Sequence, residues 1–128
     1  MEYPFKPKST SHIEQGHFWA VPIGDGNYSC GVVLALVSNE NKRDPRMFLA
    51  GLLDWAGNSL PQSNQLEGCA VLDKGFAHIK TITETGGEIL GQVVREFGYP
   101  KIIETTDTIS TWGYNFVTKK AVKRYGCS

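Results

Sequence analysis

Long apolar segments are missing from this 128-residue chain, and so is any pattern of paired cysteines. No apolar run approaches the ~20 residues that a membrane-spanning helix needs, and residues 1–8 contain no apolar segment of the signal-peptide kind. The three cysteines, Cys30, Cys69 and Cys127, are widely spaced and form no CxxC pair. An odd number of isolated cysteines is typical of reduced thiols. We therefore expect a cytoplasmic protein with no membrane association.

Net charge is also absent, because 13 basic and 13 acidic residues balance, but the charges are unevenly distributed. Residues 54–107 contain eight acids and four bases, whereas the chain after residue 107 contains four bases and no acid. An acid-rich surface suits a basic partner, because complementary charge speeds association and fixes its register. A solvated face explains the same charges equally. Because the chain is not basic overall, we expect no nucleic-acid partner.

Metal-binding and catalytic motifs are missing as well. Residues 12–17 (HIEQGH) resemble a zinc-protease motif, but the histidines are five positions apart instead of four, and Gly16 argues against a helix. Cys30 lies in an apolar run, and no base that would activate its thiol can be named, which indicates a small buried side chain. We therefore expect no metal, no cofactor and no enzymatic activity. An unrecognised hydrolase is kept as an alternative, ranked third after the two binding functions given below.

The length of the chain suits one domain with a core of its own. Residues 1–15 contain two prolines and a run of three hydroxyl side chains, which indicates a flexible N-terminal arm. The composition shows no further boundary or repeat. We therefore expect a single domain over residues 16–128.

A β-hairpin is the clearest local prediction. Residues 16–23 (GHFWAVPI) and 29–37 (SCGVVLALV) are rich in β-branched and aromatic side chains, as in half-buried strands. Asp25 and Gly26 lie between them, and this dipeptide provides the positive φ angles that a two-residue hairpin turn requires. The second strand is expected to end near Ser38.

Shorter elements are expected beyond the hairpin. Residues 39–46 are polar and include a proline, which indicates a loop. Residues 47–55 (MFLAGLLDW) form an apolar run typical of a buried strand, although periodicity alone does not distinguish it from a helix. A helical turn is expected within residues 61–66, followed by a short strand at residues 69–73.

Residues 76–94 allow two interpretations. Residues 85–88 (TGGE) match a capping box, which would start a helix over residues 86–98. Alternatively, a helix with one apolar face ends at Gly86, and residues 89–94 form a strand. Two glycines in the first turn of a helix each cost about 1 kcal/mol relative to alanine. We therefore favour the second interpretation.

The C-terminal part is expected to contain a strand at residues 108–112 and a helix. Asn115 is suited to cap this helix, which would run to Tyr125 and end at Gly126. Strands joined by short loops, with two helices, predict an α+β domain. Glycines within the strands indicate a strongly bent antiparallel sheet or a partly open small β-barrel.

The amino-acid sequence of the hairpin motif resembles that of a known family. Its first strand fits the pattern Gly-x-x-[Phe/Trp]-Ala-[Ile/Val]-Pro-[Leu/Ile], followed by an Asp-Gly turn, which is similar to the opening motif of the immunity protein 26 family. The resemblance covers residues 16–55 and continues through residues 71–79 and 85–91. An arginine that the family often has in its second strand is replaced here by Val32. Because the match consists mainly of glycines, turns and core residues, it bears on the fold more than on the partner.

Proteins of that family are associated with bacterial polymorphic toxins and protect the cell that makes them. The resemblance therefore implies an immunity protein that neutralises a cognate toxin by direct binding, the expected toxin being a nuclease or another that acts in the cytosol. The alternative is a small β-barrel adaptor or scaffold that binds a peptide or protein ligand. A toxin gene beside this one would distinguish the two.

Carboxylates are the expected contact residues, because the active site of a nuclease is electropositive. Glu84 and Glu88 flank the glycine turn at residues 86–87, where side chains are expected to be exposed. We therefore predict that Glu84, Glu88 and Asp25 contact the toxin. The competing prediction is that the contact surface is the basic C-terminal tail or an apolar patch centred on Trp112, because aromatic side chains often provide much of the binding energy of an interface.

Overall fold

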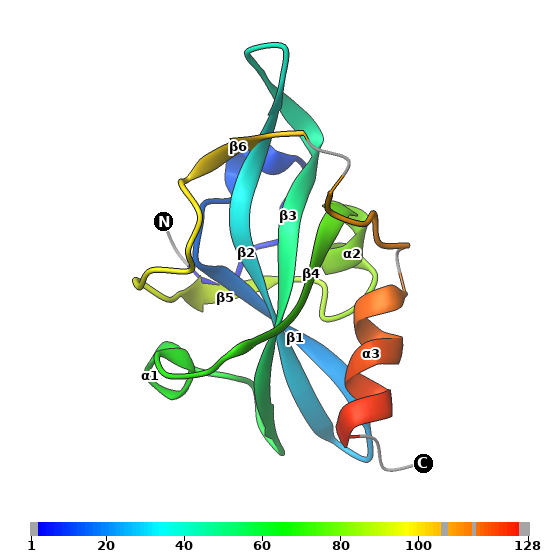
Figure 1. Cartoon of the computed structure of the whole chain (residues 1–128). Coiled ribbons are helices and arrows are strands. Elements are labelled where there is room, and N and C mark those ends of the chain that lie inside the picture. The colour runs from blue at the N-terminus through cyan, green and yellow to red at the C-terminus, as the bar shows by residue number, and fades with distance from the viewer. Residues whose placement is uncertain (1–2, 106–107, 114, 126–128) are drawn as a thin grey trace.

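A computed structural model describes residues 3–105, 108–113 and 115–125. The strands are β1 (His17–Gly24), β2 (Asn27–Asn39), β3 (Lys42–Gly57), β4 (Val71–His78), β5 (Ile89–Gln92) and β6 (Ile102–Glu104). The helices are α1 (Ser63–Leu66), α2 (Lys80–Thr83) and α3 (Phe116–Tyr125), and a 3-10 turn, η1, spans Thr10–His12. Figure 1 shows their arrangement around one sheet.

The sheet has the order β4-β3-β2-β1-β5 with antiparallel neighbours, and β6 pairs in parallel with β2. The prediction of an α+β domain with a bent antiparallel sheet is confirmed. The barrel alternative is wrong, because no pairing within the described residues joins the edge strands β4 and β5. Irregularities in the β2–β3 register bend the long strands, since an extra residue on one strand increases local twist. The described residues hold three short α-helices instead of the two expected.

Both expected strands of the first hairpin are confirmed, and so is its two-residue turn. Asp25 and Gly26 have φ angles of 54° and 76°. The polar loop expected at residues 39–46 is much shorter, because Glu40 and Asn41 form a second tight turn with φ angles of 53° and 67°. Asparagine tolerates this conformation, so pairing continues outward to Asn39 and Lys42. The β2–β3 hairpin consequently projects from the body of the molecule (Figure 1).

The favoured interpretation of residues 76–94 is confirmed in part. A strand does follow the glycine turn, but β4 continues to His78, so the helix is limited to α2. The helix expected over residues 86–98 in the rejected interpretation is not formed. Gly87 has a φ of 91° and its N–H donates to the carbonyl of Ile82, which ends the helical turn.

The last part of the chain differs from expectation in one element. Instead of a strand at residues 108–112, only Thr111 pairs with Phe76 of β4, in parallel. The parallel strand β6 was not predicted, because its partner β2 is far away in the sequence. The predicted C-terminal helix is confirmed as α3, beginning directly after Asn115. Its expected end at Gly126 lies outside the described residues.

Apolar side chains cover both faces of the sheet. Alternate residues of β3 belong to two different clusters, with Phe48, Ala50 and Leu52 in one and Leu49 and Leu53 in the other. Successive side chains of a strand point to opposite faces, so each cluster occupies one face. This two-sided burial explains why the apolar residues of β2 form a nearly continuous run instead of alternating with polar ones.

Residues 3–15, expected to form part of a loose arm, lie against the sheet in the structure. Phe5 and Ile89 exchange backbone hydrogen bonds of 3.1 and 2.8 Å. Thr10 donates its hydroxyl to the carbonyl of Asp44 at 2.5 Å, and Ile13 is 1% exposed within the core. This segment therefore completes the core beside β3 and β5.

Candidate functional site

Three hollows lie along the segment between β5 and β6, and neighbouring hollows share one lining residue, Tyr99 or Val94. The first, of about 350 Å³, lies between β4 and the side chains of Phe97 and Tyr99. The second, of about 580 Å³, extends from Tyr99 to Val94, and the third, of about 480 Å³, extends from Val94 to Tyr3 along β5 and the start of α1. The segment between β5 and β6 therefore lines all three hollows, which extend from the edge strand β4 to the edge strand β5. We call the surface around the second and third hollows the opening surface, defined by Tyr3, Gln15, Leu90, Val94 and Tyr99.

Among the described residues, Val94 is the most exposed large apolar side chain, at 90%. Its neighbour Val93 is 2% exposed and donates its N–H to the carbonyl of Gly16 at 2.9 Å. A Cβ on Gly16, which has a φ of 93°, would lie 2.2 Å from the carbonyl oxygen of Val93. This close approach holds the backbone so that Val93 points inward and Val94 outward.

Hydrogen bonds from two side chains hold the segment around Val94 in place. Arg95 donates from Nη1 to the carbonyls of Leu66, Glu67 and Cys69 at 2.9, 3.1 and 2.7 Å. Its guanidinium also lies 4.6 Å from the centre of the Phe97 ring. From the other side, Gln15 donates from Nε2 to the carbonyls of Leu34 and Tyr99, both at 2.9 Å. A surface fixed in this way loses little conformational entropy when a partner binds.

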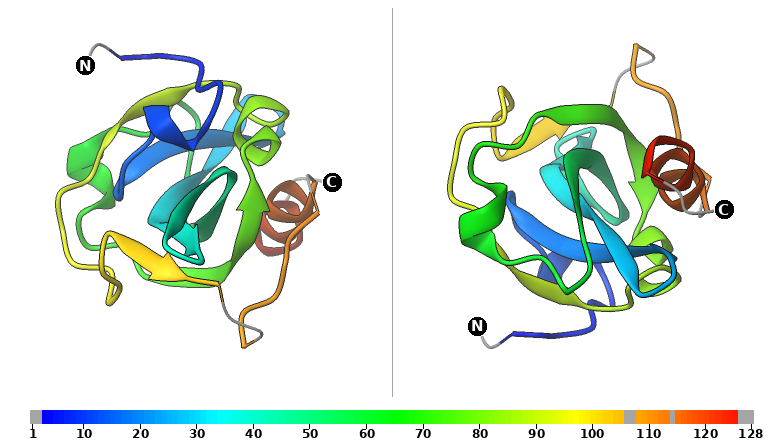
Figure 2. Two further views of the ribbon diagram at one scale, coloured as in Figure 1. Left: turned by 90° about the horizontal axis from the view of Figure 1, so that it is seen from above. Right: turned by 90° about the horizontal axis from the view of Figure 1, so that it is seen from below.

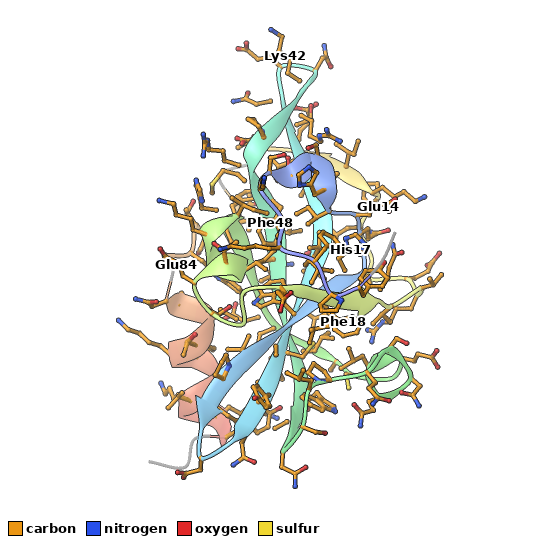
Figure 3. All side chains as sticks on the ribbon, turned by 180° about the vertical axis from the view of Figure 1, so that it is seen from behind. Glu14, His17, Phe18, Lys42, Phe48 and Glu84 are labelled. Carbon is orange, nitrogen blue, oxygen red and sulfur yellow. The ribbon has the colours of Figure 1, made fainter. Side chains whose placement is uncertain are left out.

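Charged side chains of both signs border the opening surface. Glu96 lines the second hollow, and Glu14 directly precedes Gln15, another of its lining residues. Figure 3 shows Glu14 beside His17, on the side away from Glu84. Glu67 is exposed, and its carbonyl binds Arg95. Glu96 therefore shares the lining of the second hollow with Arg95, whose Nη1 donates to backbone carbonyls. Lys74 lies 5.2 Å from the centre of the Tyr99 ring, so cationic groups border the surface as well.

Asp25, Glu84 and Glu88 are all exposed, as predicted for the two glutamates, but the structure does not bring all three together. Asp25 lies at the β1–β2 turn, at the lower end of the sheet in Figure 1, whereas α2 and the turn that follows it lie higher in the same view. A Cβ on Gly86 would lie 2.1 Å from the carbonyl oxygen of Ala20, so the glycine turn packs directly on β1. Glu84 and Glu88 consequently flank a turn that is firmly held against the sheet.

Trp112 is 4% exposed and belongs to the core cluster that contains Val117 and Ala121 of α3. Its ring also lies 5.1 Å, centre to centre, from that of Phe116. The indole therefore packs between α3 and the sheet, and its surface is not available for the predicted apolar contact patch. A tryptophan near a helix start gives the same signal in sequence whether it is buried or exposed.

Two buried side chains inside the core resemble reactive groups but are held in inert forms. Cys30 is fully buried, and its burial raises the pKa of the thiol well above its ordinary value, which matches the expected structural role. His17 is also fully buried, and Nδ1 accepts the N–H of Glu14 at 2.9 Å. Burial lowers the pKa of His17, with a smaller opposing effect from the Glu14 carboxylate.

Within residues 3–105, 108–113 and 115–125, no three His, Cys, Asp or Glu side chains gather in the geometry of a metal site. None of the described helices combines the length and apolar character needed to cross a bilayer. Sequence reasoning did not single out Val94, because its outward orientation depends on a contact with Gly16, which is distant in sequence. Comparison with known proteins found no match to a family model, a curated protein or a solved structure.

Proposed function

We propose that this chain is an immunity protein that neutralises a cognate bacterial toxin by direct binding, and that the opening surface is where the toxin docks. The observation that carries the docking site is the 90% exposure of Val94 between two hollows. Contiguous exposed apolar surface is typical of protein interaction sites, and Tyr3, Leu90 and Val94 line the same hollow here. The toxin as partner rests on the resemblance of residues 16–55 to the immunity protein 26 family.

The rigidity of the surface supports inhibition by binding. Arg95 and Gln15 hold the segment on both sides of Val94 before any partner arrives. Inhibitors that are already in their bound conformation bind tightly, because little ordering remains to be done. Full burial of Val94 in a complex would contribute about 1.5–3 kcal/mol.

A protection assay tests this proposal. The chain is expressed together with the product of the neighbouring gene, and growth and complex formation are measured. We expect the unmodified chain to restore growth and Val94→Asp to lose protection, because the substitution places a charge at the centre of the contact. Val122→Asp is the matched control, since Val122 is also exposed but lies on α3. A neighbouring product that is not toxic, or toxicity that the unmodified chain does not relieve, would contradict the proposal.

An adaptor that binds an extended peptide is the second candidate. It is favoured by the edge strand β5, which has no second strand partner within the described residues apart from the pairing of Ile89 with Phe5. The third hollow follows this edge along Leu90, Gly91 and Gln92. Extended peptides bind to sheet edges of this kind through backbone hydrogen bonds. Peptide binding without any protection from a toxin would support this candidate.

A further inference from the structure

We infer that the toxin docks on the opening surface by strand addition, with an extended segment of the toxin pairing its backbone with the edge of β5 from Gln92 to Val94. This inference rests on the proposed function and specifies how the partner binds at that surface. It differs from the adaptor candidate in its occupant, which here is the toxin itself instead of a peptide ligand.

The main chain of Gln92 points away from the sheet. Gln92 pairs with His17 of β1. The N–H of Val93, the next residue, donates at 2.9 Å to the carbonyl of Gly16, the residue before His17. In an antiparallel ladder, such a bond marks a pair whose own N–H and C=O groups point away from each other. The N–H of His17 agrees with this direction, because it donates to the carbonyl of Glu14 instead of to β5. The N–H and C=O of Gln92 therefore face outward from the edge.

This end of the β5 edge is open in the structure. Phe5 and Ile89 exchange backbone hydrogen bonds at the start of β5, but this contact is an isolated bridge that extends no further. Among residues 3–105, 108–113 and 115–125, the main-chain groups of Gln92 and Val94 have no hydrogen-bond partner outside the sheet ladder. Both views of Figure 2 place this end of β5 at the rim of the molecule, across from α3. The edge can therefore accept the backbone of another chain.

The opposite edge of the sheet, β4, is closed. Phe76 donates its N–H to residues 110–112 at 2.9 Å and accepts an N–H from the same segment at 2.8 Å. Two residues earlier, the N–H of Lys74 donates to the carboxylate of Asp73 at 2.8 Å. Soluble proteins block or charge their sheet edges, because unpaired backbone groups attract another strand. Residues 90–94 carry no charged side chain, so the edge of β5 lacks this protection.

The surface beside this edge suits an extended occupant. The third hollow, of about 480 Å³, follows β5 from Leu90 to Gln92 and reaches Val94. Alternate side chains of an added strand point to the same side, so they would lie in this hollow against Leu90 and Tyr3. Backbone pairing then provides affinity, and the hollow provides specificity. The edge is also held in place, because Gln92 donates from Nε2 to the carbonyl of Gln15 at 2.9 Å.

A proline at position 92 tests the backbone contact. Gln92→Pro removes the outward N–H, and prolines are tolerated on edge strands where the N–H faces solvent. Gln92→Ala is the matched control, because it keeps the N–H and loses the same side-chain hydrogen bond to Gln15. Titration calorimetry measures binding to the product of the neighbouring gene, and thermal melting shows whether each variant folds. We expect Gln92→Pro to bind at least about tenfold more weakly than Gln92→Ala, because a carbonyl of the added strand loses its donor. Equal affinity of the two folded variants would overturn the inference.

Amide hydrogen exchange measures the same contact in the unmodified chain. In the free protein, the amides of Gln92 and Val94 should exchange rapidly and that of Val93 slowly, because only Val93 donates within the protein. In the complex with the neighbouring product, exchange at Gln92 and Val94 should slow at least about tenfold. Rapid exchange at both positions in the complex would contradict strand addition, even if Gln92→Pro failed to fold.

The remaining outcomes separate this inference from the proposed function. If Val94→Asp loses protection while Gln92→Pro binds as tightly as Gln92→Ala, the toxin docks here through side chains alone. The proposed function then stands, and strand addition is wrong. If the neighbouring product pairs with the edge but is not toxic, the pairing stands and the proposed function is wrong. Sedimentation of the chain alone tests for a second copy. Self-association that Gln92→Pro abolishes would assign the edge to that copy and overturn the inference.

Discussion

The indole of Trp112 lies directly on the backbone of Gly75, so closely that a Cβ on Gly75 would be 2.2 Å from both Cδ1 and Nε1 of the ring. The backbone of Trp112 is fixed in this place by its main-chain N–H, which donates to the carbonyl of Phe76 at 2.8 Å. On its other side the indole contacts Phe116 at the start of α3. This pair of residues therefore determines how α3 covers the sheet.

Gly75→Ala is expected to lower the free energy of unfolding by about 1–3 kcal/mol, because the new methyl group displaces the Trp112 ring from a packed position. Urea denaturation monitored by tryptophan fluorescence measures the change. Gly68→Ala is the matched control, since nothing lies within 4 Å of a Cβ at that position. We expect the control to change stability by no more than about 0.5 kcal/mol. Equal stability of the two variants would contradict the role assigned to Gly75.

Gly26→Val is expected to lower the melting temperature through backbone strain alone. Gly26 has a φ of 76°, and a Cβ there would have no neighbour within 4 Å. A β-branched residue at positive φ costs on the order of 1–2 kcal/mol. Asparagine tolerates this conformation better, so Gly26→Asn should retain most of the stability. Partner affinity measured well below the melting temperature should stay unchanged in both variants, and a large loss of affinity would instead place this turn in the binding site.

Stability is expected to fall as the pH drops below about 6.5, with His17 as a principal cause. Burial lowers the pKa of His17 in the folded protein from its ordinary value of 6.5, so the unfolded chain takes up a proton first. The free energy of unfolding therefore decreases as pH falls from that value toward the lowered pKa. Protonation of Nδ1 would also break the hydrogen bond from the N–H of Glu14.

The contribution of His17 can be separated from that of His78, whose pKa is also lowered, mainly by burial. Denaturation is measured between pH 5 and 8 in His17→Gln and in His78→Gln. We expect His17→Gln to flatten the pH dependence more strongly, because His17 is fully buried and His78 is only partly buried. An unchanged slope in His17→Gln would mean that this histidine does not control acid stability.

The two carboxylates at the glycine turn can be compared directly with the opening surface. Glu84→Lys with Glu88→Lys should fold normally, because both side chains are exposed. If the sequence-based prediction holds, this variant associates slowly with the toxin and loses protection, most clearly at low salt. Since we propose that the toxin docks on the opening surface, we expect the double variant to retain protection in the assay in which Val94→Asp loses it. Loss of protection in the double variant alone would return the site to the turn.

Local structure was predictable wherever neighbouring residues decide it. The Asp25-Gly26 turn, the strand that follows it and the C-terminal helix beginning after Asn115 depend on φ preferences and apolar patterns that are readable in the sequence. The hairpin at Glu40 and Asn41 was missed, because polar and charged residues paired across an exposed hairpin have the same composition as a loop. The parallel pairing of β6 with β2 was not predictable, since no local signal specifies which distant strand a short segment joins.

The sequence by itself determined the α+β class, the first hairpin and the exposure of Glu84 and Glu88. The tertiary structure decided that the sheet stays open, that Trp112 is buried on Gly75, and that Val93 points inward while Val94 points outward. The physical reason is that side-chain direction follows from the backbone register, and the register here depends on long-range contacts such as that between Gly16 and Val93. Val93 and Val94 are adjacent residues of the same type, and only the contact with Gly16 distinguishes the core residue from the exposed one.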